Sequence, residues 1–192
     1  DFFVFEKVVK FLAENKKKGR KLIPISVNAS ILHARNCDTV EHYMEILNRY
    51  GVNPALLEIE LTETALLESH QFEFVKQVLD GFRRIGIAVA LDDFGFAYSS
   101  LSLLKALEVD TLKLDRTFFL NESKRSRNIV CNVIQLAHSL NMSVVAEGIE
   151  QMEQVEVLKA MRCDLIQGYV YSRPIPVGEF EAWREAYENQ KY

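Results

Sequence analysis

The sequence has little of what marks disulfide-stabilised, membrane-spanning or nucleic-acid-coating proteins. Its three cysteines, Cys37, Cys131 and Cys163, have no paired spacing, so they indicate thiols in a reducing compartment rather than a disulfide framework or a zinc site. No apolar stretch approaches the ~20 residues that a membrane span needs. The net charge of −4 argues against a nucleic-acid polymer as partner, but allows a small phosphorylated ligand. These absences predict a cytoplasmic location without membrane contact.

Two common kinds of catalytic machinery are also missing. The four histidines, His33, His42, His70 and His138, fall outside the ends of the predicted strands, so a histidine-based triad has no visible partner set. No Gly-rich phosphate loop is present. The segment DDFG at 92–95 contains the Asp-Phe-Gly motif of protein kinases, but the Gly-rich loop and the catalytic-loop signature of kinases are absent.

What is present predicts one α/β domain over residues 1–192. Hydrophobic residues make up 48% of the chain, enough for one core. Short β-branched runs predict strands, and apolar residues at helical spacing between them predict amphipathic helices. The predicted strands span 22–28, 56–62, 87–93, 111–115, 143–147 and 164–169, and the helical stripes include 40–47, 72–82, 129–140 and 155–161. Strands with apolar residues on both faces, alternating with helices, predict βαβ units and a parallel sheet.

Two N-terminal segments have alternative interpretations. The basic run NKKKGRK at 15–21 could attract phosphates or anionic lipid, but its place between a helix and a strand favours simple solvation. The segment Phe2–Leu12 could lie on a membrane surface, but it has no wide cationic face, which favours the outer helix of a barrel. The chain begins with Asp1 rather than Met, so we expect it to be part of a longer polypeptide.

Polar residues stand at the end of every predicted strand. They are Asn28, Glu60, Asp92 with Asp93, Lys113 with Asp115, Glu147, and Gln167. In parallel α/β folds the carboxyl ends of all strands open on one face, and in a closed barrel they converge on its mouth. We therefore expect these side chains to meet in one acidic site.

The adjacent aspartates Asp92 and Asp93 form either a solvated turn or part of a metal site. Two carboxylates at one strand end repel each other and are costly to desolvate unless a cation lies beside them. Carboxylate and amide oxygens suit Mg²⁺ or Mn²⁺ rather than zinc. Four carboxylates carry too much charge for one ion, so the pattern favours two cations bridged by Asp92.

With these residues assembled, the sequence resembles the EAL-domain family, the cyclic di-GMP phosphodiesterases of bacterial signalling. The matching segments are, in order, SVNAS, LEIELTET, LDDFG, YSSLSLLKALEVDTLKLDR, VVAEGIE and LIQGYVYSRP. The resemblance implies a TIM-like (β/α)8 barrel with one antiparallel strand and Mg²⁺ or Mn²⁺ at its mouth. It also implies hydrolysis of one phosphodiester bond of cyclic di-GMP, giving linear pGpG.

The same resemblance implies a role for each residue at the strand ends. Asn28, Glu60 and Asp92 would hold the first metal, and Asp92, Asp93 and Glu147 the second. Lys113 would orient the attacking water, and Glu147 matches the proposed general base. Supporting roles would fall to Asp115, Gln167, Glu150 and Glu63, with Glu63 bracing the loop after Asp93.

Two departures from the family pattern bear on activity. The Glu-Ala-Leu motif itself is missing, together with two strands that precede Phe2 in the family and supply a metal-ligating glutamate and a substrate-binding arginine. We therefore expect a barrel lacking its first two strands, truncated or completed by another chain, and inactive as residues 1–192 alone. In the loop after Asp93, Phe96 and Ala97 replace a threonine and a glycine. Because Ala97 would resist a positive φ, we expect slowed hydrolysis.

Two functions therefore remain open. The first is a metal-dependent phosphodiesterase within a larger protein, working as a homodimer with an upstream sensory or GGDEF domain. The second is a catalytically inactive receptor that binds cyclic di-GMP or a protein partner. The set of residues suited to bind metal favours the enzyme. The missing Glu-Ala-Leu motif and the altered loop after Asp93 favour the receptor.

Overall fold

The computed structural model describes residues 1–29, 39–67, 72–95, 100–120 and 123–189. Its centre is a six-stranded sheet in which the strands follow one another in sequence order and run parallel. The strands are β1 (Ile25–Asn28), β2 (Leu57–Thr62), β3 (Ala88–Phe94), β4 (Thr111–Leu114), β5 (Ser143–Ala146) and β6 (Leu165–Ile166). The predicted parallel α/β sheet is confirmed, and each strand falls within or beside its predicted run.

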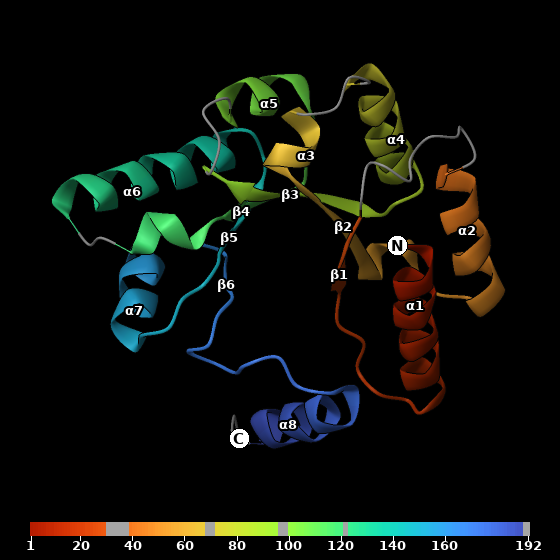
Figure 1. Cartoon of the computed structure of the whole chain (residues 1–192). Coiled ribbons are helices and arrows are strands. Elements are labelled where there is room, and N and C mark those ends of the chain that lie inside the picture. The colour runs from red at the N-terminus through yellow and green to blue at the C-terminus, as the bar shows by residue number, and fades with distance from the viewer. Residues whose placement is uncertain (30–38, 68–71, 96–99, 121–122, 190–192) are drawn as a thin grey trace.

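The helices lie mainly on the outer side of the sheet, which curves into an arc with β1 and β6 at its ends (Figure 1). They are α1 (Phe2–Lys17), α2 (Thr39–Tyr50), α3 (Glu63–Leu67), α4 (Phe72–Arg84), α5 (Ser100–Ala106), α6 (Lys124–Ser139), α7 (Met152–Ala160) and α8 (Val177–Asn189), with 3-10 helices η2 (Pro54–Leu56) and η3 (Arg116–Phe119). This is the arrangement expected of a TIM-like (β/α)8 barrel without its first two strands. The antiparallel strand that the resemblance implied is not among the described residues.

The two faces of the sheet differ in chemistry. Side chains alternate between the faces of a strand. The face toward the helices is apolar and nearly fully buried, as shown by Val27, Leu57, Ile59, Leu61, Val89, Leu91, Leu112, Leu114, Val144 and Ala146. The opposite face carries polar side chains such as Glu58 and Thr111. The expectation of apolar residues on both faces holds for β3 and β5, where Ala90 and Val145 on the inner face are buried. It is wrong for β2 and β4, where Glu58 and Thr111 on the inner face hydrogen-bond to each other.

The helices pack on narrower stripes than their sequence pattern predicts. In α2, Tyr43 and Leu47 are buried but Met44 is exposed. At the two ends of the stripe predicted over 129–140, Ile129 in α6 and Leu140 just after this helix are exposed as well. A helix that packs on one curved sheet covers only the residues directly facing it, so the flanking members of a predicted stripe remain in solvent.

The first helix packs as an outer barrel helix. Phe5, Val9 and Leu12 are buried, and the Phe5 ring lies 4.4 Å from that of Tyr43 on α2. The basic run at 15–21, which begins in the last turn of α1, is mostly exposed, as predicted, although Arg20 forms ion pairs with glutamates of α8. Within the described part of the chain, no helix combines the length and the apolar character required to span a bilayer.

Candidate metal centre

A buried lysine lies among three carboxylates at the carboxyl ends of the strands. Lys113 on β4 forms ion pairs with Glu60 Oε1 at 2.9 Å, Asp92 Oδ1 at 3.1 Å and Glu147 Oε1 at 2.8 Å. Its side chain is only 5% exposed. Residues from four different strands or strand ends therefore meet at one point, as the sequence pattern predicted.

The chain turns sharply directly after Asp92. Asp93 has a φ of +56°, which is uncommon for a residue with a side chain, and its N–H donates to Asp92 Oδ1 at 3.0 Å. Such a conformation costs roughly 1–2 kcal/mol. The turn places the carboxylate of Asp93 close to that of Asp92. One oxygen from each of Asp92, Asp93 and Glu147 lies within 4.8 Å of the other two.

Burial and mutual repulsion change the protonation of this cluster. Burial raises the pKa of Glu147 to about 7, with the charge of Asp92 adding to the effect, and hydrogen bonds from Lys113 only partly oppose it. Burial and then the charges of Asp92 and Asp115 raise the pKa of Asp93 above its usual range. Burial lowers the pKa of Lys113, but the hydrogen bonds to Glu147 and Glu60 outweigh it and raise that pKa overall.

Three of the predicted site residues lie further out. The Asn28 side chain is exposed at the end of β1, where its Cα pairs with that of Glu60. Gln167 and Glu150 are exposed as well. Both line an open cavity of about 880 Å³ that also reaches Glu60 and Lys113. The positions of Gln167 and Glu150 suit contact with a ligand in the mouth better than contact with the buried carboxylates.

Two further predicted residues hold the backbone around the site. Glu63 is completely buried, and its Oε2 accepts a hydrogen bond at 3.0 Å from the N–H of Gly95, in the turn after Asp93. Asp115 caps η3, because its Oδ1 accepts from the N–H of Thr117 at 2.9 Å. Each therefore contacts backbone near the carboxylate cluster.

A second polar layer below the cluster escaped the sequence analysis. Ser26 donates to Glu58 Oε2 at 2.6 Å, and Thr111 donates to Glu58 Oε1 at 2.5 Å. The signal was present in the segment LEIEL, where Glu58 precedes Glu60 by two residues and so faces the same side.

Arg116, which lines the same cavity as Lys113, was also missed. Phe96 and Ala97, singled out from the sequence, lie outside the described residues.

The donor set fits a hard divalent cation. Asp92, Asp93 and Glu147 offer carboxylate oxygens close enough together to share an ion, and such oxygens are the ligands that Mg²⁺ and Mn²⁺ prefer. An ion would also offset the repulsion that raises the pKa values of Glu147 and Asp93.

Comparison with known proteins gives consistent matches. The sequence model of the EAL domain family matches residues 1–174. The chain is 32% identical over 189 residues to the cyclic di-GMP phosphodiesterase NbdA of Pseudomonas aeruginosa, a match that covers 97% of this chain but 24% of that protein. The chain thus spans about a quarter of this relative's length.

Solved structures share the fold. The EAL domain of Mycobacterium smegmatis DcpA superposes with a TM-score of 0.85 at 32% identity, covering 93% of this chain and 81% of that one. Klebsiella pneumoniae BlrP1, in a manganese and cyclic di-GMP complex, superposes with a TM-score of 0.78 at 30% identity, covering 90% of this chain and 44% of that one.

Proposed function

The chain belongs to the EAL domain family, and from this premise we propose that it hydrolyses cyclic di-GMP to linear pGpG with the help of divalent metal ions. The observation that carries the proposal is the meeting of Asp92, Asp93 and Glu147 within 4.8 Å at the sheet's carboxyl edge. The names of the relatives support the substrate, since NbdA is called a cyclic di-GMP phosphodiesterase and BlrP1 was solved with cyclic di-GMP and manganese.

We propose two ions, Mg²⁺ or Mn²⁺, held by the residues at the strand ends. Asn28, Glu60 and Asp92 would hold one, and Asp92, Asp93 and Glu147 the other. Bound divalent ions would acidify a water molecule and offset negative charge on the phosphate. The number of carboxylates in the cluster supports this assignment. Glu60, Asp92 and Glu147 surround one lysine, Lys113, so its single positive charge does not balance their negative charges.

The protein's own residues would handle the proton. Glu147 is the proposed general base and would accept a proton from the attacking water. Lys113 remains protonated, and in the metal-free protein its ammonium group is paired with Glu60, Asp92 and Glu147. When ions bind these carboxylates, its N–H groups would be released and would hold the oxygen of that water in place. The water oxygen would bond to phosphorus, and the bond from phosphorus to the ribose 3′ oxygen would break. The proton that Glu147 took from the water would then pass through solvent to that 3′ oxygen, which balances the step and completes pGpG.

The proposal is tested by incubating the full-length protein with Mn²⁺ and cyclic di-GMP and separating the products by chromatography. We expect pGpG from the wild type and none from Asp92→Asn or Glu147→Gln. The matched control Glu156→Gln changes an exposed glutamate of α7 and should retain wild-type turnover. Binding of cyclic di-GMP without conversion by the wild type would instead support the receptor function.

We also propose that these residues act within a longer signalling protein and as a homodimer. The small share of NbdA and BlrP1 that the chain covers supports the first point. The homodimer follows from family resemblance, and the mass of the full-length protein by analytical ultracentrifugation tests it. A monomeric mass at micromolar concentration would contradict it.

A further inference from the structure

Two of the carboxylates proposed as metal ligands, those of Asp93 and Glu147, are each followed by a glycine with positive φ. Gly95, two residues after Asp93, has a φ of +99°, and Gly148, directly after Glu147, has a φ of +66°. Each glycine lies within two residues of its carboxylate, so the position of its backbone affects where that carboxylate lies.

The same short helix touches both glycines. A Cβ atom on Gly95 would collide with the Phe118 ring, whose atoms are the three nearest neighbours at that point. A Cβ atom on Gly148 would lie 2.5 Å from Cβ of Arg116. Phe118 and Arg116 both belong to η3, so this element fills the space between the turn after β3 and the turn after β5.

Hydrogen bonds fix η3 to the end of β4. Asp115, which precedes it, donates its N–H to the carbonyl of Phe94 at 3.4 Å and caps the helix through its side chain. The N–H of Glu147 donates to the carbonyl of Leu114 at 3.1 Å. Because η3 begins three residues after Lys113, the strand that carries the lysine also sets the position of η3.

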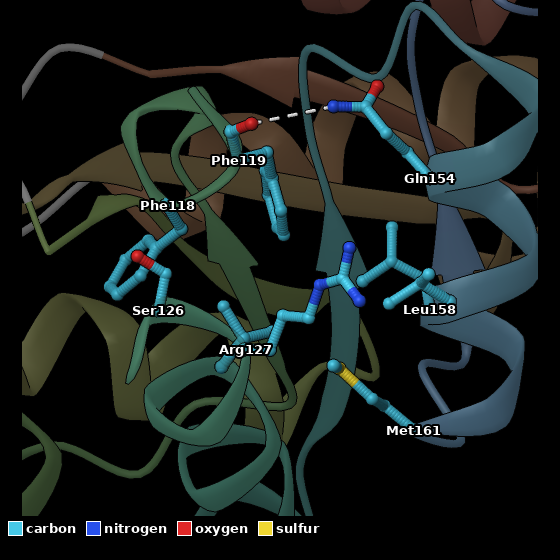
Figure 2. A pocket seen from close by; sticks show the side chains of 9 residues that line it. Phe118, Phe119, Ser126, Arg127, Gln154, Leu158 and Met161 are labelled. Atoms are coloured by element: carbon cyan, nitrogen blue, oxygen red, sulfur yellow. Dashed lines mark hydrogen bonds between the residues drawn. The ribbon is translucent and has the colours of Figure 1, made fainter. Parts of the chain in front are cut away.

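The outer side of η3 is packed with little free space. Phe118 and Phe119 line a pocket with Leu158 and Met161 (Figure 2), with a volume of about 30 Å³. That space suffices for about one water molecule. Gln154 reaches from α7 to the carbonyl of Phe119 at 3.5 Å, and its Oε1 accepts from the N–H of Glu150. With α6 and α7 behind it, η3 has little room to move away from the glycines.

We propose that η3 is a wedge that fixes the separation of Asp93 and Glu147, and that Phe118 and Arg116 are positioning residues for the metal centre. Truncating Phe118 lets the turn at Gly95 relax toward the emptied space, which moves the Asp93 carboxylate relative to that of Glu147. The inference rests on the proposed function only in that a divalent ion binds between these carboxylates.

The test is the affinity for Mn²⁺ without substrate, measured by titration calorimetry or electron paramagnetic resonance at a temperature well below each variant's Tm. We expect Phe118→Ala to raise the Kd for Mn²⁺ about 10–100-fold, the range typical when groups supporting metal ligands are lost. Phe118→Leu, which keeps a branched apolar side chain there, should restore most of the affinity. Arg116→Lys, which keeps the same aliphatic stem, should stay near the wild-type value.

The matched control is Phe119→Ala. Phe119 has the same size, is its neighbour on η3 and lines the same pocket, but it is not among the atoms nearest to Gly95. We expect Phe119→Ala to lower the Tm as Phe118→Ala does and to leave the Kd for Mn²⁺ within about twofold of wild type, by analogy with packing losses distant from a site. Equal effects of the two variants on Kd, or no effect of either, would overturn the wedge while leaving the metal site intact. A wild type that binds no Mn²⁺ would overturn both the wedge and the proposed metal function.

Discussion

Replacing Lys113 by Met removes the buried cation from the carboxylate cluster with little change in side-chain length. In the metal-free protein, Glu60, Asp92 and Glu147 would then lose their ion pairs at 2.9, 3.1 and 2.8 Å with one ammonium group. Breaking a buried charge pair from one side costs about 3–5 kcal/mol. For a protein of this length that corresponds to a fall in Tm of roughly 6–20 °C.

The pH and metal dependence of this loss give it a distinctive pattern. The loss should be larger at pH 8 than at pH 5, because Glu147, whose pKa is raised to about 7, is protonated at pH 5 and then does not need the lysine. Millimolar Mn²⁺ should recover much of the Tm of Lys113→Met, since an ion can take over the neutralising charge. Thermal melting followed by circular dichroism, with chelator and with Mn²⁺, measures both effects.

The control for this experiment is Lys159→Met. Lys159 lies on the surface of α7 and forms an exposed ion pair with Glu156 at 2.8 Å. Such pairs contribute about 0–1 kcal/mol, so its Tm should remain close to that of the wild type. A Lys113→Met protein as stable as Lys159→Met in chelator would refute the argument that the cluster depends on a buried cation.

Three further predictions follow from individual residues. The pKa of Glu147 in the folded state is raised from 4.5 to about 7, so the folded protein binds this proton more tightly than the unfolded chain does. The metal-free protein should therefore lose stability as pH rises between these two values. Glu147→Gln should flatten that part of the curve of Tm against pH, measured by melting in chelator. Gly168→Ala should lower stability by about 1–3 kcal/mol in urea unfolding, because its Cβ would meet a backbone carbonyl, whereas Gly178→Ala in α8 has open space and should be neutral or stabilising. Burial alone would raise the pKa of Asp164, but hydrogen bonds, first with His138 at 2.8 Å, lower it overall. Asp164→Asn should therefore be less stable than the wild type above pH 3.8, and the difference in Tm should vanish in stronger acid. A difference in Tm that does not depend on pH would contradict this.

The strand ends were predictable from sequence because their signal is local. An apolar run that stops at a charged residue identifies both the strand and its end, which is how Glu60, Asp92 and Glu147 could be assigned to one site before their distances were known. The parallel topology followed from the same alternation of strands and helices, and the structure confirms it.

Features that depend on contacts between distant residues could not be predicted in this way. Glu58 stands in a run that reads as apolar, and its role in a polar layer depends on Ser26 and Thr111 from the neighbouring strands. The contact of Phe118 with Gly95 likewise joins residues that share no sequence pattern. Sequence periodicity gives the face of a side chain, but not the partner that it meets there.

The central claim is that carboxylates from separate strand ends form one divalent metal centre, and anomalous diffraction tests it most directly. Crystals of the full-length protein would be soaked with Mn²⁺ and cyclic di-GMP, and data collected near the manganese absorption edge. The account predicts anomalous peaks within coordination distance of Asp92, Asp93 and Glu147, with Asp92 contacting two ions about 3.5–4 Å apart. No peak beside Asp92 at millimolar Mn²⁺ would contradict the account.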